Sequence, residues 1–587
     1  MLIYDILSKT EGVSLKHRGK GVNLRLNKMH RNIGRKTFIA LLLDLCEYVN
    51  TPKSLAIALS IRYINTIDSA NLKAVCSVDP LHYLDHYSYF KDAQACAFLK
   101  KSNMFKKKYD EKDLLTFYRR SEEQAIIQHE QLSSTIPEKV YQQIFAVRGI
   151  IRSIIGNLPH EVHGRFGPGS TYLLRGDDAS LAGKMVHRLE STALAEDAVI
   201  HVIKNSMLHQ HFSNFHYDTG SDPRFSGGIV RDAIIDRVRP SIVPGDRFCL
   251  VDKDLFKPRA MCPQPTGNMA VQLGTADILE RRFYRFSGIK LSETDAIHKE
   301  LVTSCYDLFG TIDLSDASDS ISLKLIELLF PREWYNLIRA ITCRQTRVGD
   351  TWYPNRKAFA QGCGITFIIE SIIFYAITYV TVKKLALQPD IRSMVSVYGD
   401  DIIVPIHYHQ EVVEALELFS FKVNREKSFG LTSPFKESCG SDTFNGMDVR
   451  PLYLKEYDLT YPSLLILTNT ISKIFECITH SEDPRTKRIW YRLVDLFKNT
   501  GIKPHFVPLE CSESEGVRID KRLFHYKHQI QHVTVVIQRL SYIDIFNANY
   551  NFNLFFAGHT GRLFTRQSKV VWLGLRARPL LQDPAMK

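Results

Sequence analysis

Residues 393–406, SMVSVYGDDIIVPI, contain the feature that most limits how this chain can fold. Two runs of apolar and β-branched residues flank Tyr398-Gly399-Asp400-Asp401, so we expect a β-hairpin with the two acids at its tip. Gly399 can adopt a positive φ, which allows a tight turn. Adjacent carboxylates repel one another unless a cation neutralises them, so the pattern predicts a divalent metal ion at the tip. The alternative is a solvated acidic turn.

The segment LFGTIDLSDASDSISLKLIELLF contains a second acidic centre. Phe309–Ile312 predicts a short buried strand that delivers Asp313 to its end, where the carboxylate needs a partner. Ser315 or Asp316 is expected to cap the helix that follows. Asp316 and Asp319 can also be explained as a cap and a first-turn acid, which the helix dipole favours.

Three of these acids can serve one site. Two metal ions about 4 Å apart need carboxylates from more than one element of structure. Asp313, Asp400 and Asp401 supply such a set from two elements. The sequence therefore predicts a two-metal centre between the strand and the hairpin.

The charge of the chain favours a polyanionic partner. Its 76 lysines and arginines against 63 acids give a formal net charge of +13. Such an excess is typical of proteins that bind nucleic acid or acidic membranes, although it can serve solubility alone. Basic groups that displace counterions from phosphates, with aromatics that stack on bases, favour nucleic acid. Two basic clusters occur: Lys16, Arg18, Lys20, Arg25, Lys28, Arg31, Arg35 and Lys36, and then Lys100, Lys101, Lys106, Lys107 and Lys108, of which the second is interleaved with Phe105 and Tyr109.

The cysteine and histidine patterns argue against a disulfide framework and against a zinc site. The eleven cysteines include no CxxC pair. The histidine-rich stretches, at His209, His211, His216, His407 and His409, lack cysteines at zinc-finger spacing. The N-terminus MLIYDILSKTEG also lacks the layout of a secretion signal. We therefore expect a protein of a reducing cytoplasm.

Residues 365–382 form a long apolar stretch that Glu370 and Ser371 interrupt. A charged residue near the centre of a bilayer costs about 3 kcal/mol. We therefore expect a buried helix in a large protein and no membrane partner.

The periodicity of the apolar residues changes along the chain. The first 150 residues have helical periodicity, and the loop RFGPGST follows at Arg165 to Thr171. From about Leu250 to Tyr453, short β-like runs alternate with amphipathic helices, which predicts an α/β or α+β core. Helical and irregular segments return after Pro462.

The ordered motifs DLSDASDS, QGCGITFIIES, YGDD and FKVNREKSFG resemble the palm motifs of viral RNA-dependent RNA polymerases. The resemblance is strongest to the replicase β subunits of the single-stranded RNA bacteriophages, the leviviruses such as phage Qβ, and PFKESCG and FGPGS add to it. It extends from about Arg165 to Pro451. It implies an α+β right-hand polymerase, with an antiparallel palm sheet backed by helices and mainly helical flanks. By position, residues 1–240 would form the fingers, 241–460 the catalytic palm with a fingers insertion, and 461–587 the thumb and C-terminal region.

The resemblance also implies roles for individual residues. The chain would be an RNA-directed RNA polymerase, a nucleotidyltransferase of viral RNA replication, working with two Mg²⁺ ions that Mn²⁺ or Ca²⁺ can replace in binding. Asp313, Asp400 and Asp401 would bind the metals, and Lys427 would protonate pyrophosphate. The implied nucleotide-binding residues are Lys253, Lys257, Arg259, Ser318, Asp319, Gly362 and Thr366, with Gly364 supporting the same loop. Each basic residue could instead be an exposed surface group.

The implied partners are RNA template and product, ribonucleoside triphosphates, host elongation factors Tu and Ts, and a ribosomal RNA-binding protein, in the cytoplasm of a bacterial host. The chain departs from many viral polymerases at Ser318, which is followed by Asp319, and at Glu370 and Cys363. A reverse transcriptase is one alternative, but it would carry a bulky aromatic residue just after Asp313. A non-catalytic RNA-binding palm protein is another, but it would be expected to have lost a carboxylate.

Overall fold

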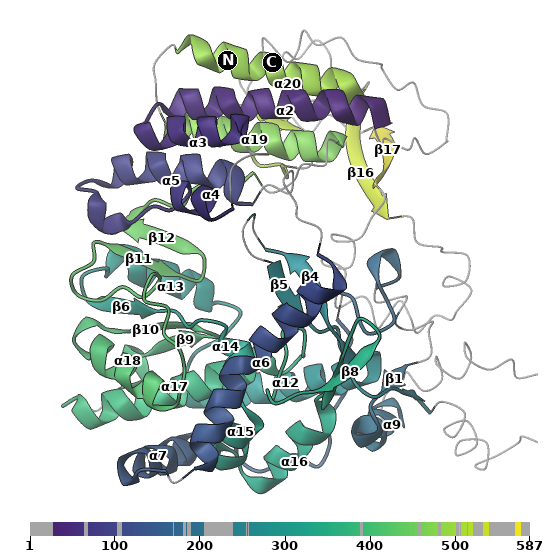
Figure 1. The fold of residues 1–587 in the computed structure, drawn as a ribbon, viewed down its shortest axis with the longest axis vertical. Coiled ribbons are helices and arrows are strands. Elements are labelled where there is room, and N and C mark those ends of the chain that lie inside the picture. Colours follow the sequence, from purple (N-terminus) through teal and green to yellow (C-terminus); the bar gives the residue numbers. More distant parts are fainter. Residues whose placement is uncertain are drawn as a thin grey trace, which may run out of the picture.

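The computed structural model describes most of the chain from Lys28 to Ile519 and two later strands. The described ranges are 28–63, 69–101, 109–134, 136–167, 169–179, 184, 189–204, 239–253, 255, 258–387, 391–454, 460–478, 483–500, 504, 506–513, 515–519, 532–538 and 570–576. Small sheets lie in the middle of the molecule, with helices towards both ends of its long axis (Figure 1). This arrangement confirms the α+β class.

The N-terminal helices pack against C-terminal ones. α2 (Lys28–Val49), α3 (Pro52–Arg62) and α5 (His86–Lys100) share a hydrophobic core with α19 (Tyr461–Cys477) and α20 (Pro484–Thr500). These helices are stacked at one end of the molecule in Figure 1. The helical character predicted for the first 150 residues is confirmed for their described part.

A buried carboxylate joins the two ends of the chain. Asp44 on α2 is 7% exposed, forms an ion pair with Arg488 Nε at 2.9 Å, and accepts a hydrogen bond from Arg492 Nε at 3.3 Å, both on α20. The hydroxyl of Tyr48 donates to the carbonyl oxygen of Ile478 at 2.5 Å. Polar contacts therefore orient α2 on α20 where apolar packing alone would be unspecific.

A three-stranded antiparallel sheet lies at the centre, in the order β6 (Phe309–Ile312), β10 (Asp401–Pro405) and β9 (Ser396–Tyr398). α17 (Thr366–Leu385) packs against β9 and β10, and α18 (His409–Leu418) packs against β6 and α17. The strand and the hairpin expected here, backed by helices, are both confirmed.

α17 contains the long apolar stretch. Among the described residues it is the one helix long and apolar enough to cross a membrane, but 83% of its most apolar window is buried inside the protein. It contacts α7 (Glu138–Ile155) and α12 (Thr266–Ser287) as well as the central sheet. The prediction of a core helix is therefore confirmed.

Two further small sheets lie beside the central one. β3 (Asp246–Arg247) pairs in parallel with β7 (Gln345–Val348), which pairs antiparallel with β8 (Thr351–Pro354). β4 (Cys249–Asp252) and β5 (Pro258–Met261) form an antiparallel hairpin. α6 (Glu111–Ser133) crosses this part of the molecule (Figure 1).

The remaining elements complete the fold. They are α4 (Ser69–Val75), α6 (Glu111–Ser133), α9 (Glu196–Lys204), α13 (Thr294–Ser304), α14 (Ala317–Ser320), α15 (Leu323–Leu329), α16 (Arg332–Ile341), β1 (Glu190–Ser191), β2 (Ser241–Ile242), β11 (Phe435–Ser438), β12 (Ser441–Phe444), β13 (Met447–Asp448), β14 (Phe506–Pro508), β15 (Val517–Ile519), β16 (His532–Gln538) and β17 (Val570–Arg576), with short 3₁₀ turns at Pro80–His82, Gly176–Ala179, Ala193–Ala195, Arg392–Met394 and Ile406–Tyr408. None of the eleven cysteines forms a disulfide. The domain boundaries at 240 and 460 stay a prediction.

One expectation was wrong in detail. The segment after Asp313 is two short helices rather than one, because the chain leaves the helical conformation at Ile321. Asp316 precedes α14 with a left-handed φ of 50° and makes no capping bond through its side chain. Ser322 caps the second helix, α15, by accepting the N–H of Leu325 at 3.2 Å.

We expect Asp44→Asn to lower the thermal unfolding midpoint, because two arginines of α20 lose the charge that orients them. The free energy of unfolding should fall by about 1–2 kcal/mol, since the carboxylate is buried but both arginines are partly exposed. Asp495→Asn is the matched control, because Asp495 is an exposed acid of α20 that pairs with Lys498 at 3.6 Å. Equal midpoints for the two variants would show that the buried pairs do not stabilise this interface.

Candidate active site

Two constraints fix the hairpin tip at Gly399. This residue has a φ of 61°, and a Cβ added to it would lie 2.7 Å from the ring of Phe367. Its N–H donates to the hydroxyl of Ser371 on α17 at 2.9 Å. Any side chain here would strain the backbone and collide with α17, so glycine is what lets Asp400 and Asp401 stand at the tip.

The strand register brings a third acid to the hairpin. In the antiparallel ladder between β6 and β10, Ile312 lies opposite Ile402. Asp313 follows Ile312 and Asp401 precedes Ile402, so these two acids form the next opposed position. Cβ atoms at directly opposed positions are about 5 Å apart. The structure thus brings together the three acids that the sequence singled out.

Burial and mutual repulsion weaken the acidity of these carboxyls. Burial raises the pKa of Asp313 to about 6, with Asp400 adding to the rise and Lys427 and Asn424 opposing it. Burial, with Asp400 and Asp313, raises the pKa of Asp401 to about 7. Burial also raises the pKa of Asp400. Burial, and for Asp313 and Asp401 the neighbouring carboxylates, therefore disfavour the ionised forms of these groups, and a bound cation would relieve this.

Neutral donors orient two of the acids. Asn424 Nδ2 donates to Asp313 Oδ2 at 2.8 Å, and the N–H of Cys439 donates to Asp401 Oδ2 at 3.2 Å. Cys439 lies in the turn between β11 and β12 with a φ of 47°. Its Sγ is 3.1 Å from Nδ1 of His298, which is fully buried on α13. Backbone and amide donors thus fix the carboxylates without cancelling their charge.

Lys427 lies at the edge of the acidic cluster. Its Nζ donates to Glu437 Oε1 at 2.8 Å. Burial alone would lower the pKa of Lys427, but Glu437, Asp313 and Asp401 outweigh it and raise the pKa above its ordinary value. The lysine is therefore charged at neutral pH, and it could release a proton readily only after Glu437 or the aspartates had been neutralised.

Two residues of the basic β4–β5 region face the acids. Lys253 and Arg259 are exposed, and both lower the pKa of Asp400, against the larger effect of burial. Arg259 lies on β5 opposite Val251. Lys257 lies outside the described residues.

The loop before α17 has little room for a side chain at its first glycine, Gly362. Gly362 has a φ of 113°, and a Cβ there would lie 2.9 Å from the carbonyl oxygen of Cys262. The N–H of Gly364 donates to Gln272 Oε1 at 2.9 Å. Thr366 begins α17 and is buried, with its hydroxyl 3.3 Å from the carbonyl oxygen of Ala360. This loop is therefore held rigidly beside the acidic hairpin.

Ser318 and Glu370 form a buried pair close to the acids. Ser318 on α14 lies beside the Glu370 carboxyl and lowers its pKa, against the larger effect of burial, and both residues are under 9% exposed. Glu370 Oε1 has no hydrogen-bond partner among the described residues. Burial, then Asp400 and Asp319, raises the pKa of Glu370 well above its ordinary value. One polar oxygen thus lacks a partner at the edge of the site, which is costly unless a ligand supplies one.

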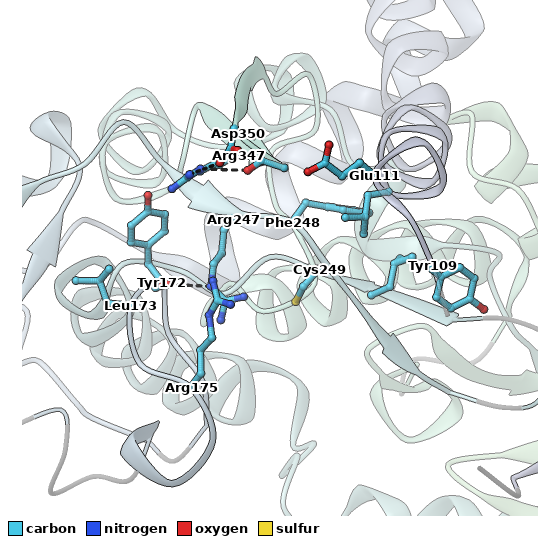
Figure 2. A pocket seen from close by; sticks show the side chains of 13 residues that line it. Tyr109, Glu111, Tyr172, Leu173, Arg175, Arg247, Phe248, Cys249, Arg347 and Asp350 are labelled. Carbon is cyan, nitrogen blue, oxygen red and sulfur yellow. Dashed lines mark hydrogen bonds and ion pairs between the residues drawn. The ribbon is translucent and has the colours of Figure 1, made fainter. Parts of the chain in front are cut away.

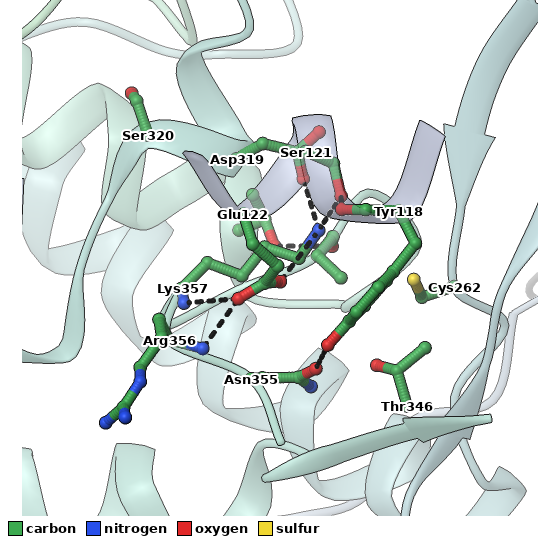
Figure 3. A network of polar contacts seen from close by, with 12 residues as sticks. Tyr118, Ser121, Glu122, Cys262, Asp319, Ser320, Thr346, Asn355, Arg356 and Lys357 are labelled. Carbon is green, nitrogen blue, oxygen red and sulfur yellow. Dashed lines mark hydrogen bonds and ion pairs between the residues drawn. The ribbon is translucent and has the colours of Figure 1, made fainter. Parts of the chain in front are cut away.

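Asp319, unlike its neighbour Ser318, binds the ammonium group of a buried lysine. Its Oδ1 accepts from Lys357 Nζ at 2.9 Å, and Lys357 lies 3.4 Å from Glu122 Oε1 and 3.0 Å from Ser121 Oγ. Figure 3 shows these groups converging on one ammonium between α6 and α14. The carboxylate of Asp319 therefore serves a buried ion cluster rather than the open side of the site.

Glu122 of this ion cluster also binds the backbone at residues 356 and 357. Glu122 Oε2 accepts the N–H of Arg356 at 2.6 Å and that of Lys357 at 3.2 Å. Burial alone would lower the pKa of Lys357, but Asp319 and Glu122 raise it, so the ammonium stays charged. The segment that leads into the loop at Gly362 is thereby tied to α6.

The donor set suits a hard divalent cation. Within the described part of the chain, no three His, Cys, Asp or Glu side chains converge closely enough to enclose an ion alone. Asp313, Asp400 and Asp401 still fit one chemically, because they are oxygen donors whose mutual repulsion a cation would relieve. Water or phosphate oxygens would complete the coordination, as is usual for magnesium.

Sequence reasoning missed several residues of the site. Asn424 stood inside a quoted motif but received no role, and its place three residues before Lys427 was the available signal. Glu122 and Lys357 are 235 residues apart, and His298 and Cys439 are 141 apart. No local pattern reports such long-range pairs.

Comparisons with known proteins find related sequences. A family model described as RNA replicase, beta-chain, matches residues 86–548. The RNA-directed RNA polymerase subunit beta of Enterobacteria phage SP is 34% identical over 272 residues, which cover 46% of this chain and 45% of that protein. The RNA-directed RNA polymerase beta chain of Escherichia phage MS2 is 33% identical over 254 residues, covering 43% and 45%. The subunit beta of Escherichia virus Qbeta is 32% identical over 256 residues, covering 43% and 42%.

The chain spans less than half the length of these curated relatives. Among solved structures, the RNA-dependent RNA polymerase of a human picorbirnavirus aligns with a TM-score of 0.30 and 12% identity, over 43% of this chain and 55% of that one. A similarity of this size does not establish a common fold.

We expect Lys357→Met to destabilise the protein by about 3–5 kcal/mol, because Glu122 and Asp319 would be left as buried, unpaired charges. Lys324→Met is the matched control: Lys324 pairs with Glu327 at 3.0 Å near the surface, and its loss should cost less than about 1 kcal/mol. Thermal unfolding of the two variants makes the comparison. Adding Glu122→Gln and Asp319→Asn to Lys357→Met should recover much of the loss, and no recovery would contradict the charge explanation.

Proposed function

We propose that this chain, which belongs to the RNA replicase β-chain family, is the catalytic subunit of an RNA-directed RNA polymerase. In this function it joins ribonucleotides to a growing RNA strand under the direction of an RNA template. The observation that carries the proposal is the convergence of Asp313, Asp400 and Asp401 through the β6–β10 register and the Gly399 turn. Phosphoryl transfer leaves little covalent work to the protein, so positioned charge is what the reaction needs.

The three aspartates would hold two divalent ions, which we propose to be Mg²⁺. Such ions, when bound, activate the attacking 3′-hydroxyl and offset the charge of the leaving pyrophosphate. The raised pKa values of Asp313 and Asp401 support this, because a cation would stabilise buried carboxylates that lie close to one another. The strands β6 and β10 fix the positions of the aspartates, and the aspartates in turn would orient the reacting groups.

Basic residues of the chain would bind the triphosphate. Lys253 and Arg259 already act electrostatically on Asp400, and Lys257 would belong to the same segment. Their charges attract phosphate oxygens to the side of the hairpin that carries the acids. Lys427 would give its proton to the departing pyrophosphate once the approach of the triphosphate and its ions had weakened the pull of Glu437.

The ribose would be read by a small polar pocket. Ser318 and Glu370 are paired, and the free oxygen of Glu370 offers a place for a sugar hydroxyl. Thr366 and Gly362 would shape the same pocket. We propose that Asp319 acts indirectly, because its bond to Lys357 positions α14 and thereby Ser318. The segment after Asp313 carries no large aromatic residue that would exclude a 2′-hydroxyl.

The larger assignments rest on position along the chain and on the resemblance of the motifs to phage replicases. We propose fingers from residues 1–240, a palm from 241–460 and a thumb region from 461–587. The partners would be RNA template and product, ribonucleoside triphosphates, the host elongation factors Tu and Ts, and a ribosomal RNA-binding protein, in the cytoplasm of a bacterial host.

We expect Asp400→Asn to reduce metal-dependent nucleotide incorporation by at least about a thousandfold while the fold is kept, because an amide is a poor ligand for a hard cation. Primer extension on an RNA template with Mg²⁺ measures this. Asp307→Asn is the control, since Asp307 is an exposed acid just before the other end of β6. Incorporation at the wild-type rate by folded Asp400→Asn would rule out the two-metal assignment.

We expect the wild-type chain to prefer ribonucleotides over deoxyribonucleotides by at least about a hundredfold in kcat/KM, since a site built to bond a hydroxyl rejects a substrate without one. Ser318→Ala should erode this ratio more than it lowers the rate with ribonucleotides. Ser320→Ala is the control, because the Ser320 hydroxyl donates to the Ala317 carbonyl within α14 and points away from the ion cluster in Figure 3. Equal use of both sugars by the wild-type chain would favour a reverse transcriptase.

A further inference from the structure

A cavity of about 750 Å³ lies beside the β4–β5 hairpin, on residues that the proposed chemistry does not use. Its walls come from β3, β4, the turn after β7, the start of α6 and the loop that follows residue 170. Figure 2 shows its lining. The polar and charged residues that matter here are Glu111, Tyr172, Arg175, Arg247, Arg347 and Asp350.

Two guanidinium groups meet in this cavity without a carboxylate. Arg175 and Arg247 point toward one another in Figure 2, while Glu111 lies on the other side. Within the described part of the chain neither arginine forms an ion pair, whereas Arg347 pairs with Asp350 at 2.6 Å. Burial, and then Arg175, lowers the pKa of Arg247. Adjacent like charges of this kind are stabilised when an anion lies between them.

The loop that carries Arg175 is fixed before any ligand arrives. Arg247 Nε donates to the carbonyl oxygen of Tyr172 at 2.8 Å, and the N–H of Tyr172 donates to that of Gln264 at 2.8 Å. The hydroxyl of Thr171 accepts from that of Thr266 at 2.9 Å. A loop that is already ordered loses less entropy on binding, which favours recognition.

The aromatic ring of Tyr172 lines the cavity. The ring of Tyr172 stacks on that of Trp352 on β8, with centroids 6.3 Å apart and planes 20° from parallel. Flat aromatic groups beside positive charge are what unpaired nucleobases and their phosphates bind, and they do so without sequence preference.

We propose that this cavity holds a single-stranded stretch of the RNA template, with Arg175 and Arg247 on a phosphodiester and Tyr172 beside a base. The inference rests on the proposed polymerase function and deepens it by naming where the unpaired strand binds. The volume is in the range of sites for small ligands and too small for a duplex. Arginine is suited to this role because its planar fork matches two phosphate oxygens.

The path of β4 places the cavity relative to the acids. Cys249 lines the cavity at one end of β4, and Lys253, which acts on Asp400, follows the other end. Four residues of strand span about 13 Å. A stacked strand advances about 3.4 Å per nucleotide, so the length of β4 corresponds to about four nucleotides of template between the cavity and Lys253.

The test is equilibrium binding of the full chain to RNA primer–template duplexes with 5′ template overhangs of one or eight nucleotides. For wild type the longer overhang should bind more tightly. Arg175→Ala should remove about fivefold of that gain and flatten the salt dependence on the long overhang by about 0.7 in log–log slope, the value of one lost phosphate contact. Arg175→Lys should retain the slope.

Arg148→Ala is the matched control, because Arg148 is an exposed arginine on α7 outside the cavity, and it should keep both the gain and the slope. Arg247 is not the variant of choice, since it also supports the loop at Tyr172. An equal loss on both overhangs would mean a general charge effect and overturn the proposal. A raised KM for nucleotides with unchanged RNA binding would assign the cavity to the triphosphate and overturn it as well.

The measurement separates this inference from the polymerase proposal. RNA binding needs no chemistry, so a chain that fails to incorporate nucleotides could still show the overhang dependence of Arg175. Conversely, an active polymerase whose overhang gain is insensitive to Arg175→Ala would leave the polymerase proposal intact and defeat the cavity assignment.

Discussion

The antiparallel register between β6 and β10 is the constraint on which the candidate site depends. Shifting it by one residue would turn Asp313 to the opposite face of the sheet, because side chains alternate along a strand. The register is itself held by burial: Ile312 and Ile402 face the core, and α17 closes over the hairpin where Gly399 bonds Ser371. The packing of the core therefore holds three like charges close together, although they repel one another.

Buried charge connects this site to the rest of the molecule. The ammonium of Lys357 is shared by Glu122 on α6 and Asp319 on α14, and Glu122 also binds the backbone at residues 356 and 357. A cluster of this kind contributes little net stability but specifies one arrangement, since any misplacement leaves a buried charge unpaired. It links the N-terminal region, the first acidic motif and the loop before α17 in a single unit.

The acidic hairpin and the cavity at Arg175 and Arg247 carry opposite charges. At the hairpin, carboxylates exceed the positive charge around them, and the structure suits cations there. In the cavity beside β4, Arg175 and Arg247 exceed the local carboxylates, and the structure suits an anion. β4 runs between the two, so one short strand connects a place for a phosphate backbone with a place for metal-assisted transfer. This division of charge is consistent with a strand of RNA passing along the hairpin toward the acids.

Local patterns in the sequence were enough to determine the acidic hairpin, the strand that ends at Asp313, the buried nature of α17 and the α+β class, because each depends on neighbours within a few residues. The break between α14 and α15 escaped prediction, since the capping role of Ser322 was hidden by the stronger signal at Asp316. Only the tertiary structure decided that α2 packs on α20, that Lys357 meets Glu122 and Asp319, and that Arg175 faces Arg247. These contacts join residues 38 to about 450 positions apart, and their partners are chosen by packing and desolvation, which no local periodicity records.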